Sequence, residues 1–351
     1  MRIVLAVSAT VLSLAAQSDL RSLLESGHYR RAKSIAEQRL KSNSNDSEAH
    51  YAVSLAHYRA GDLERALSPA EKAVSLNPKD AEYHSHLAQV VGSQAEKASV
   101  FRQLGLAKRC RAELEAALAI DPRHYQANLI LMLYLLKAPG LFGGDKTRAR
   151  AMPDAISKYD PSNGFLAKAR LTREENPKAN VADLYRNAAD ADPKNYEAQT
   201  TYLDTLLTDD KNLDEVERRA RQLIAYFPDR QEGYGFLSVR YAAAGRWNEM
   251  ESTLRDGQKR VPDNLEPYLI TARRLLRDRK ELQRAEAYLN LYLTQEPEYG
   301  ASPRFQAHRL LGLVHEKQTR KPEAIAQMEK ALQLNPGFEE AKKDLKRLKA
   351  L

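Results

Sequence analysis

The stretch SEAHYAVSLAHYRAGDLERALSPAEKAVSLNP, residues Ser47–Pro78, decides the fold. Its apolar and small residues recur at helical spacing in two runs, which Gly61 and Asp62 separate. Glycine tolerates the left-handed conformation that follows many helices, and an aspartate can cap the next helix by accepting a backbone N–H bond. Pro78 ends the second run, because proline donates no N–H bond and disfavours helix at the preceding residue. The stretch therefore predicts two helices joined by a tight turn, a unit that cannot bury its apolar face alone.

The same unit recurs along the chain. Alignment on its last residue gives nine anchors, at Ser44, Pro78, Pro122, Pro161, Pro193, Pro228, Pro262, Pro297 and Pro336. Their spacings are 34, 44, 39, 32, 35, 34, 35 and 39 residues, so four of the eight lie within one residue of 34. Ala66 and Ala73, seven residues apart on the second helix of the opening stretch, are small enough to let two helices approach closely.

This pattern resembles the tetratricopeptide (TPR) repeat, a helix–turn–helix unit with a period of about 34 residues. Phe305–Pro336 matches the repeat best, with Gly312 at the small site of its first helix and Ala324 and Ala331 at those of its second. The resemblance implies an all-α fold, a right-handed α-solenoid of about nine TPR-like helix pairs over residues 17–336. Residues 337–351 read as one further amphipathic helix that caps the array.

Two consecutive units, within residues 80–161, are irregular. Asp80–Pro122 is predicted to carry about ten extra residues between its helices, and the next unit inserts the loop Ala138–Gly144. The segments GSQAEKAS and APGLFGGDKTRARAM, within Glu82–Pro161, resemble a subset of exported bacterial TPR proteins with an APGxxGG loop. That resemblance covers about 80 residues and implies no reaction. Pro69 and Pro153 fall in second helices, where an interior proline costs about 3 kcal/mol, so we expect those helices to bend or start late.

Met1–Ala16, MRIVLAVSATVLSLAA, has one cation followed by an apolar run that ends in small residues. This composition predicts a signal peptide, cleaved near Ala16 or one residue earlier, and a periplasmic or secreted protein. The alternative is an ordinary first helix of the array. No cysteine follows the run, which argues against a lipid anchor, and Leu129–Leu136 is apolar for only eight residues. We therefore expect no stable membrane insertion after cleavage.

The net charge of +8 favours acidic partners or anionic surfaces. Lysine and arginine are spread along the chain and cluster only at its end, so we expect no nucleic-acid partner. With 43% hydrophobic residues the chain has ample apolar material for a stacked core.

Three features could carry chemistry, and each has a plainer structural interpretation. Cys110 is the only cysteine, so it is either a buried inert thiol or a nucleophile activated by its flanking arginines. The loop Gly140–Thr147 reads GxxxxDKT where a phosphate-binding loop requires GxxxxGKT, and the aspartate is better explained as a helix cap. Four histidines on adjacent first helices could gather at a metal, yet two occupy positions that TPR helices use for packing: His50, His57, His84 and His86.

No HExxH, GxSxG or CxxC motif occurs in the sequence, so we predict no enzyme activity, cofactor or metal. In TPR arrays defined positions of the first helix line a concave peptide-binding face. Carried over to this chain, the resemblance selects Tyr51, Leu55, Tyr58, Arg59, Ser85 and Gln89, with His86 bordering them. Alternatively, these side chains are merely solvated or pack on neighbouring helices. The Lys/Asn carboxylate clamp of chaperone-binding TPR domains is missing, because Tyr51 and Leu55 occupy its first two sites.

The leading hypothesis is a non-catalytic scaffold that binds a protein or peptide in the bacterial cell envelope. The first alternative is an envelope-assembly accessory factor that contacts glycan or anionic surfaces through its basic C-terminal end. A weaker alternative is a hydrolase with its site in residues 82–161.

Export gives the first testable prediction. If Met1–Ala16 is a signal peptide, N-terminal sequencing of the native protein should begin near Gln17. An intact Met1 on protein recovered from the cytoplasm would contradict it.

Overall fold

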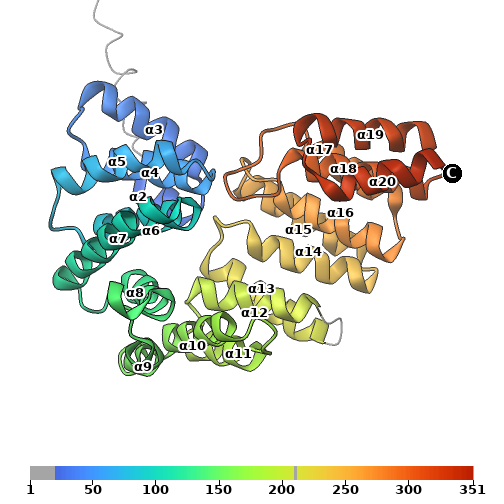
Figure 1. Cartoon of the computed structure of the whole chain (residues 1–351). Coiled ribbons are helices and arrows are strands. Elements are labelled where there is room, and N and C mark those ends of the chain that lie inside the picture. Colours follow the sequence, from blue (N-terminus) through green and yellow to red (C-terminus); the bar gives the residue numbers. More distant parts are fainter. Residues whose placement is uncertain (1–19, 209–211, 351) are drawn as a thin grey trace, which may run out of the picture. The chain divides into compact units, whose positions relative to one another are not determined.

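The computed structural model describes residues 20–208 and 212–350, and its regular elements in that part are all helices (Figure 1). The predicted signal peptide, Met1–Ala16, lies outside the described residues. The helices come in consecutive pairs and are bounded as follows: α2 Leu20–Glu25, α3 Tyr29–Ser42, α4 Ser47–Arg59, α5 Leu63–Leu76, α6 Ala81–Lys97, α7 Val100–Ile120, α8 Tyr125–Lys137, α9 Lys146–Ser157, α10 Pro161–Glu175, α11 Ala182–Ala191, α12 Tyr196–Thr208, α13 Leu213–Tyr226, α14 Glu232–Ala244, α15 Trp247–Arg260, α16 Glu266–Asp278, α17 Leu282–Tyr292, α18 Arg304–Lys317, α19 Lys321–Leu334 and α20 Glu339–Ala350.

Over the described ranges this is the predicted all-α, TPR-like array of nine pairs, followed by α20. A short 3₁₀ turn, η1 (Gly140–Phe142), lies between α8 and α9. The chain divides into two compact units, residues 1–152 and 153–351, and the boundary falls at Pro153 within α9. No helix in the described part is long and apolar enough to cross a membrane.

Recurrent prolines set the turns between pairs. At each of six anchors, the carbonyl oxygen of the residue before the proline accepts a hydrogen bond from the N–H of the residue two positions after the proline. At Pro78, for example, the Asn77 carbonyl oxygen accepts the N–H of Asp80 at 3.4 Å. Proline suits the second position of such a turn because its φ angle is already fixed there. The Asp80 carboxylate then caps α6 by accepting the N–H of Tyr83 at 3.3 Å. The six prolines are Pro78, Pro122, Pro193, Pro228, Pro262 and Pro336.

Two of the nine anchors play other roles. Pro161 is not part of a turn that closes the preceding pair but is the first residue of α10, and Asp160 caps that helix by accepting the N–H of Asn163 at 3.0 Å. Proline is tolerated there because the first helical N–H needs no intrahelical partner. Pro297 lies within the long connection between α17 and α18. Proline spacing therefore locates the ends of most repeats. At Pro161 the capping bond of Asp160 shows instead where the next helix begins.

The sequence suggested that the extra residues of the third unit lie between its two helices. The structure shows that they do not. Only Ala98 and Ser99 separate α6 from α7, and the additional residues lengthen both helices instead. The next insertion does form a loop, residues 138–145, as predicted. Pro69 does not delay its helix, because α5 begins at Leu63.

Small residues allow the helices to pack closely. Ala66, Ala73, Ala324 and Ala331 are all buried, with at most 1% of their surface exposed. A Cβ added at Gly312 would lie 2.9 Å from the Met328 Cε and 3.1 Å from the Ala324 carbonyl oxygen of the facing helix. Such distances leave no space for a side chain, so backbone proximity itself requires these residue types.

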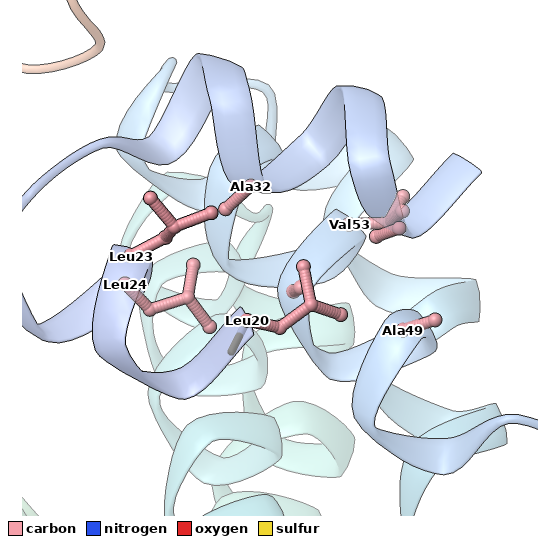
Figure 2. Close-up of a cluster of buried hydrophobic side chains, with 8 residues drawn as sticks. Leu20, Leu23, Leu24, Ala32, Ala49 and Val53 are labelled. Carbon is pink, nitrogen blue, oxygen red and sulfur yellow. The ribbon is translucent and has the colours of Figure 1, made fainter. Parts of the chain in front are cut away.

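The first and last helices bury their apolar faces against their neighbours. Figure 2 shows the side chains of α2 pointing toward α3 and α4, in a buried cluster that includes Leu20, Leu23, Leu24, Ala32, Ala49 and Val53. In α20, Ala341 and Leu348 are buried in a cluster with residues of α19, including Ala331. Phe338, just before α20, meets Phe305 edge-on with ring centroids 4.9 Å apart.

The close contacts at small residues give a second prediction. Ala331→Leu should lower the free energy of unfolding by about 1–3 kcal/mol, because overpacking shifts the backbones of α18 and α19. Ala326 lies on the same helix but is exposed, so Ala326→Leu is a matched control that should change stability little. Urea unfolding of the three proteins measures both effects. Equal stability of the two variants would show that Ala331 does not lie at a tight helix contact.

Candidate functional site

The candidate binding residues of α4 lie along one face of that helix. Tyr51, Leu55 and Tyr58 are half-buried, whereas Arg59 at the end of the helix is exposed. The Tyr51 ring stacks on that of Tyr83 in α6, with centroids 5.1 Å apart. This face of α4 is therefore partly covered by α6, the first helix of the next pair.

The two candidate residues Ser85 and His86 are buried, with 2% and 3% of their surface exposed. The His86 Nε2 lies 2.8 Å from the Ser54 Oγ, and that hydroxyl donates to the Ala66 carbonyl oxygen at 2.7 Å. The hydroxyl therefore accepts from His86, which places a proton on Nε2. Ser85 and His86 do not line an exposed surface, in agreement with the alternative that such residues pack between helices.

Burial also sets the charge of His86. The rings of Tyr51 and Tyr58 meet it edge-on, with centroids 5.3 Å and 5.8 Å away. Removal from water disfavours the imidazolium and lowers the pKa of His86 to about 4, against the opposing field of Glu82. At neutral pH the His86 side chain is therefore uncharged, and its contacts with α4 hold α6 against that helix.

A polar network joins three successive pairs of the first unit. Glu82 of α6 accepts from the Tyr51 hydroxyl of α4 at 2.8 Å and from the His124 Nε2, which caps α8, at 3.1 Å. The His124 Nδ1 accepts the N–H of Ala127 at 3.3 Å. Burial of Glu82 opposes its ionisation, but the hydrogen bonds from His124 and Tyr51 outweigh burial and lower its pKa. The bond to Glu82 in turn raises the pKa of His124.

The accessible part of the candidate site is thus smaller than the predicted set. Arg59 lies with its guanidinium carbon 5.2 Å from the ring centroid of Tyr29. The Tyr58 hydroxyl is 3.3 Å from the Ser93 hydroxyl of α6, and Gln89 is half-buried on α6. Together, these side chains offer aromatic area, a cation and an amide on helices whose positions are fixed by buried contacts.

The four candidate histidines do not converge on one point. His50 contacts the Ser44 carbonyl oxygen at 2.9 Å, and His84 contacts Glu113 at 2.6 Å. His57 lies 4.0 Å from Asp62. No three histidine, cysteine, aspartate or glutamate side chains are arranged to hold a metal ion in residues 20–208 and 212–350.

Cys110 is buried in α7, as predicted for an inert thiol. Burial raises the pKa of the Cys110 thiol to about 12, which keeps it protonated. Its flanking arginines pair elsewhere, Arg109 with Glu71 at 2.6 Å and Arg111 with Glu115 at 2.8 Å. The thiol therefore lacks the electropositive environment that activates a nucleophilic cysteine.

The glycine-rich loop after α8 uses its backbone donors internally. The N–H groups of Phe142 and Gly144 both donate to the Pro139 carbonyl oxygen, at 2.8 Å and 3.1 Å. Those of Gly143 and Asp145 donate to the carbonyl oxygens of Gly140 and Leu135, both at 2.9 Å. Asp145 caps α9 by accepting the N–H of Arg148 at 2.9 Å, as the sequence predicted. A phosphate cradle needs such N–H groups unbound, so these four donors are not available to a phosphate.

Family models described as tetratricopeptide repeats match residues 20–81 and 305–338. The chain contains tetratricopeptide repeats. No curated protein matches it significantly. Among solved structures it is similar to yeast Tom70, with 14% identity over 97% of this chain and 88% of that one and a TM-score of 0.47. A tetratricopeptide repeat protein from Parabacteroides merdae shares 14% identity over 86% of this chain and 98% of that one, with a TM-score of 0.43. A thermophilic TPR protein from Thermus thermophilus shares 22% identity over 54% of this chain and 95% of that one, with a TM-score of 0.44.

The buried His86 gives a prediction about pH. Its folded pKa, about 4, lies below its unfolded value of 6.5, so the unfolded state binds more protons as the pH falls. Stability is therefore retained above pH 6.5 and lost on acidification, by roughly 2 kcal/mol between pH 7.5 and pH 5. Urea unfolding at the two pH values measures the loss. His86→Gln should remove this part of the pH dependence, and an unchanged loss in the variant would contradict the assignment.

Proposed function

We propose that this protein is a non-catalytic scaffold that binds a protein or peptide partner along α4 and α6. Its tetratricopeptide repeats imply a protein-interaction scaffold in general. The observation that supports this location is the combination of Tyr58, Arg59 and Gln89, which remain at least partly accessible on helices fixed by the buried His86. Aromatic and arginine side chains contribute strongly to protein interfaces, and rigid helices hold them at little entropic cost.

The residues that could have supported catalysis have structural roles. Cys110 is buried, and the four backbone N–H groups of residues 142–145 donate to carbonyl oxygens of the loop and of α8. The four histidines each contact a different partner within the array. These assignments favour binding over the alternative of a hydrolase in residues 82–161.

We further propose that the protein acts in the bacterial cell envelope, in the periplasm or as a secreted protein. The support is the composition of Met1–Ala16, a cation followed by an apolar run and small residues.

The basic C-terminal helix supports the alternative of an anionic-surface factor poorly. The apolar face of α20 is buried against α19, and several of its cations are paired within the protein. Lys342 lies 2.8 Å from Glu339, Lys349 lies 2.9 Å from Glu329, and Arg347 contacts both Glu316 and Asp344. Paired cations on a packed helix favour a capping role over surface attachment.

Site-specific photo-crosslinking tests the proposed site. A photoreactive amino acid at Arg59 should capture a discrete protein partner in cells, because Arg59 is the exposed residue at the end of α4. Lys72 is exposed on α5 and provides the matched control position, which should give no such adduct. The double variant Tyr58→Ala, Gln89→Ala should weaken partner binding at least tenfold while the helical circular dichroism stays unchanged. Equal adducts from both positions, or full binding by the double variant, would contradict the proposed site.

A further inference from the structure

The helix pairs α6–α7 and α8–α9 each contain a segment that departs from the regular repeat. Helix α6 has 17 residues where α4 has 13, and α7 has 21 where α5 has 14. The added residues lie where α6 ends and α7 begins, so at 1.5 Å per residue the helices extend by about 6 Å and about 10 Å. We call residues 96–106 the hairpin tip; α6 and α7 are labelled in Figure 1. The second segment is the loop 138–145 between α8 and α9, which contains η1.

The hairpin tip and the loop 138–145 both expose apolar side chains. Phe101 in the hairpin tip is 93% exposed and Leu141 in the loop is 90% exposed. Leu104, one turn after Phe101 on α7, is also exposed. The intervening residues Arg102 and Gln103 are exposed as well, so the start of α7 extends into solvent. Single exposed apolar residues are common on protein surfaces, so the positions of these side chains at the ends of extended segments matter more than their exposure alone.

The loop 138–145 lies against α7 at Arg111, beyond the hairpin tip. Gly143 lies against the Arg111 guanidinium, and its φ angle of 83° bends the loop there. Arg111 is two helical turns after Leu104, on the same face of α7. The Tyr134 hydroxyl donates to the Phe142 carbonyl oxygen at 2.7 Å and fixes the loop on α8. The loop 138–145 is therefore fixed against both α8 and the middle of α7, and the hairpin tip extends beyond that contact.

Cations surround these apolar side chains. Residues 96–111 contain five basic residues against one glutamate, although Arg109 and Arg111 pair with Glu71 and Glu115. Residues 137–150 contain four basic residues against one aspartate. Lys97, Arg102 and Lys108 are exposed near the hairpin tip, and Lys146 and Arg148 are exposed after the loop. The one aspartate, Asp145, is already engaged in capping α9. The surface is therefore apolar at its projections and positively charged around them.

We propose that the hairpin tip and the loop 138–145 dock on the surface of an anionic phospholipid bilayer. Phe101, Leu104 and Leu141 enter the boundary between headgroups and acyl chains, and the surrounding cations contact the phosphates. Interfacial segments insert about 5–10 Å deep, which is the distance by which the hairpin exceeds the regular repeat. Basic residues beside the inserted groups add attraction to anionic lipid.

A bilayer fits this surface better than a folded partner. Phe101 and Leu141 are almost fully exposed at the ends of projecting turns, with cations between them in the sequence. A protein would have to supply matching cavities for separate projections, whereas lipid deforms around them. This surface uses residues other than Tyr58, Arg59 and Gln89, so the inference goes beyond the proposed partner binding and does not depend on it.

Vesicle co-sedimentation of the full chain tests the proposal. Vesicles of equimolar phosphatidylglycerol and phosphatidylcholine should bind the protein at least tenfold more strongly than vesicles of phosphatidylcholine alone, and added salt should weaken binding. Phe101→Ser and Leu141→Ser should each reduce binding at least fivefold. Leu334→Ser changes a leucine that is exposed elsewhere in the chain and should leave binding unchanged. The Ser variants replace exposed residues, and unchanged circular dichroism verifies their folding.

A tryptophan reporter distinguishes insertion from charge attraction alone. Phe101→Trp should be quenched by lipids brominated on their acyl chains, relative to the signal of the natural Trp247 in the parent protein. Absence of binding to anionic vesicles, or binding unaffected by both Ser variants, would overturn the proposal. Binding without quenching at position 101 would also overturn it, because the aromatic ring would not reach the acyl region.

Discussion

Close approach of helix backbones is the constraint on which the rest of this structure depends. A helix pair of about 30 residues cannot bury its apolar face alone, so each pair must pack on the next. Ala66, Ala73 and Ala331 are fully or almost fully buried, and Gly312 lies where even a methyl group would crowd Met328. Because the backbones come this close, polar side chains of successive pairs reach each other. The network of Tyr51, Glu82 and His124 and the bond between Ser54 and His86 follow from that proximity.

Local chemistry explains why much of the fold could be predicted from the sequence. Gly61 has a φ angle of 78° and Asp62 accepts the N–H of Arg65, as their residue types indicated. Most anchor prolines occupy the same four-residue turn, because proline favours its second position wherever it occurs. Pro161 shows the limit of spacing as a guide. The first position of a helix also accepts proline, and only the capping bond of Asp160 distinguishes the two cases.

Contacts between distant residues explain what the sequence did not reveal. The extra residues of the third unit are good helix formers, so their composition could not distinguish a longer hairpin from an inserted segment. Ser85 and His86 are polar and were assigned to a binding face, yet they are buried, and hydrogen bonding and ring packing hold His86 against α4. Ser54 is 32 residues from His86 in the sequence, and no local sequence pattern predicts the hydrogen bond between them. The exposure of Phe101 is likewise a consequence of where α7 extends beyond its neighbours.

Each pair of helices is stabilised by its immediate neighbours through tight contacts at small residues. Hydrogen–deuterium exchange of Ala66→Leu, followed peptide by peptide, tests it most directly. Overpacking at one contact should accelerate exchange in α4–α7 and leave α16–α19 at the rate of the parent protein, because coupling in such arrays falls off between repeats. Uniform acceleration over the whole chain, or no change in α4–α7, would contradict the account.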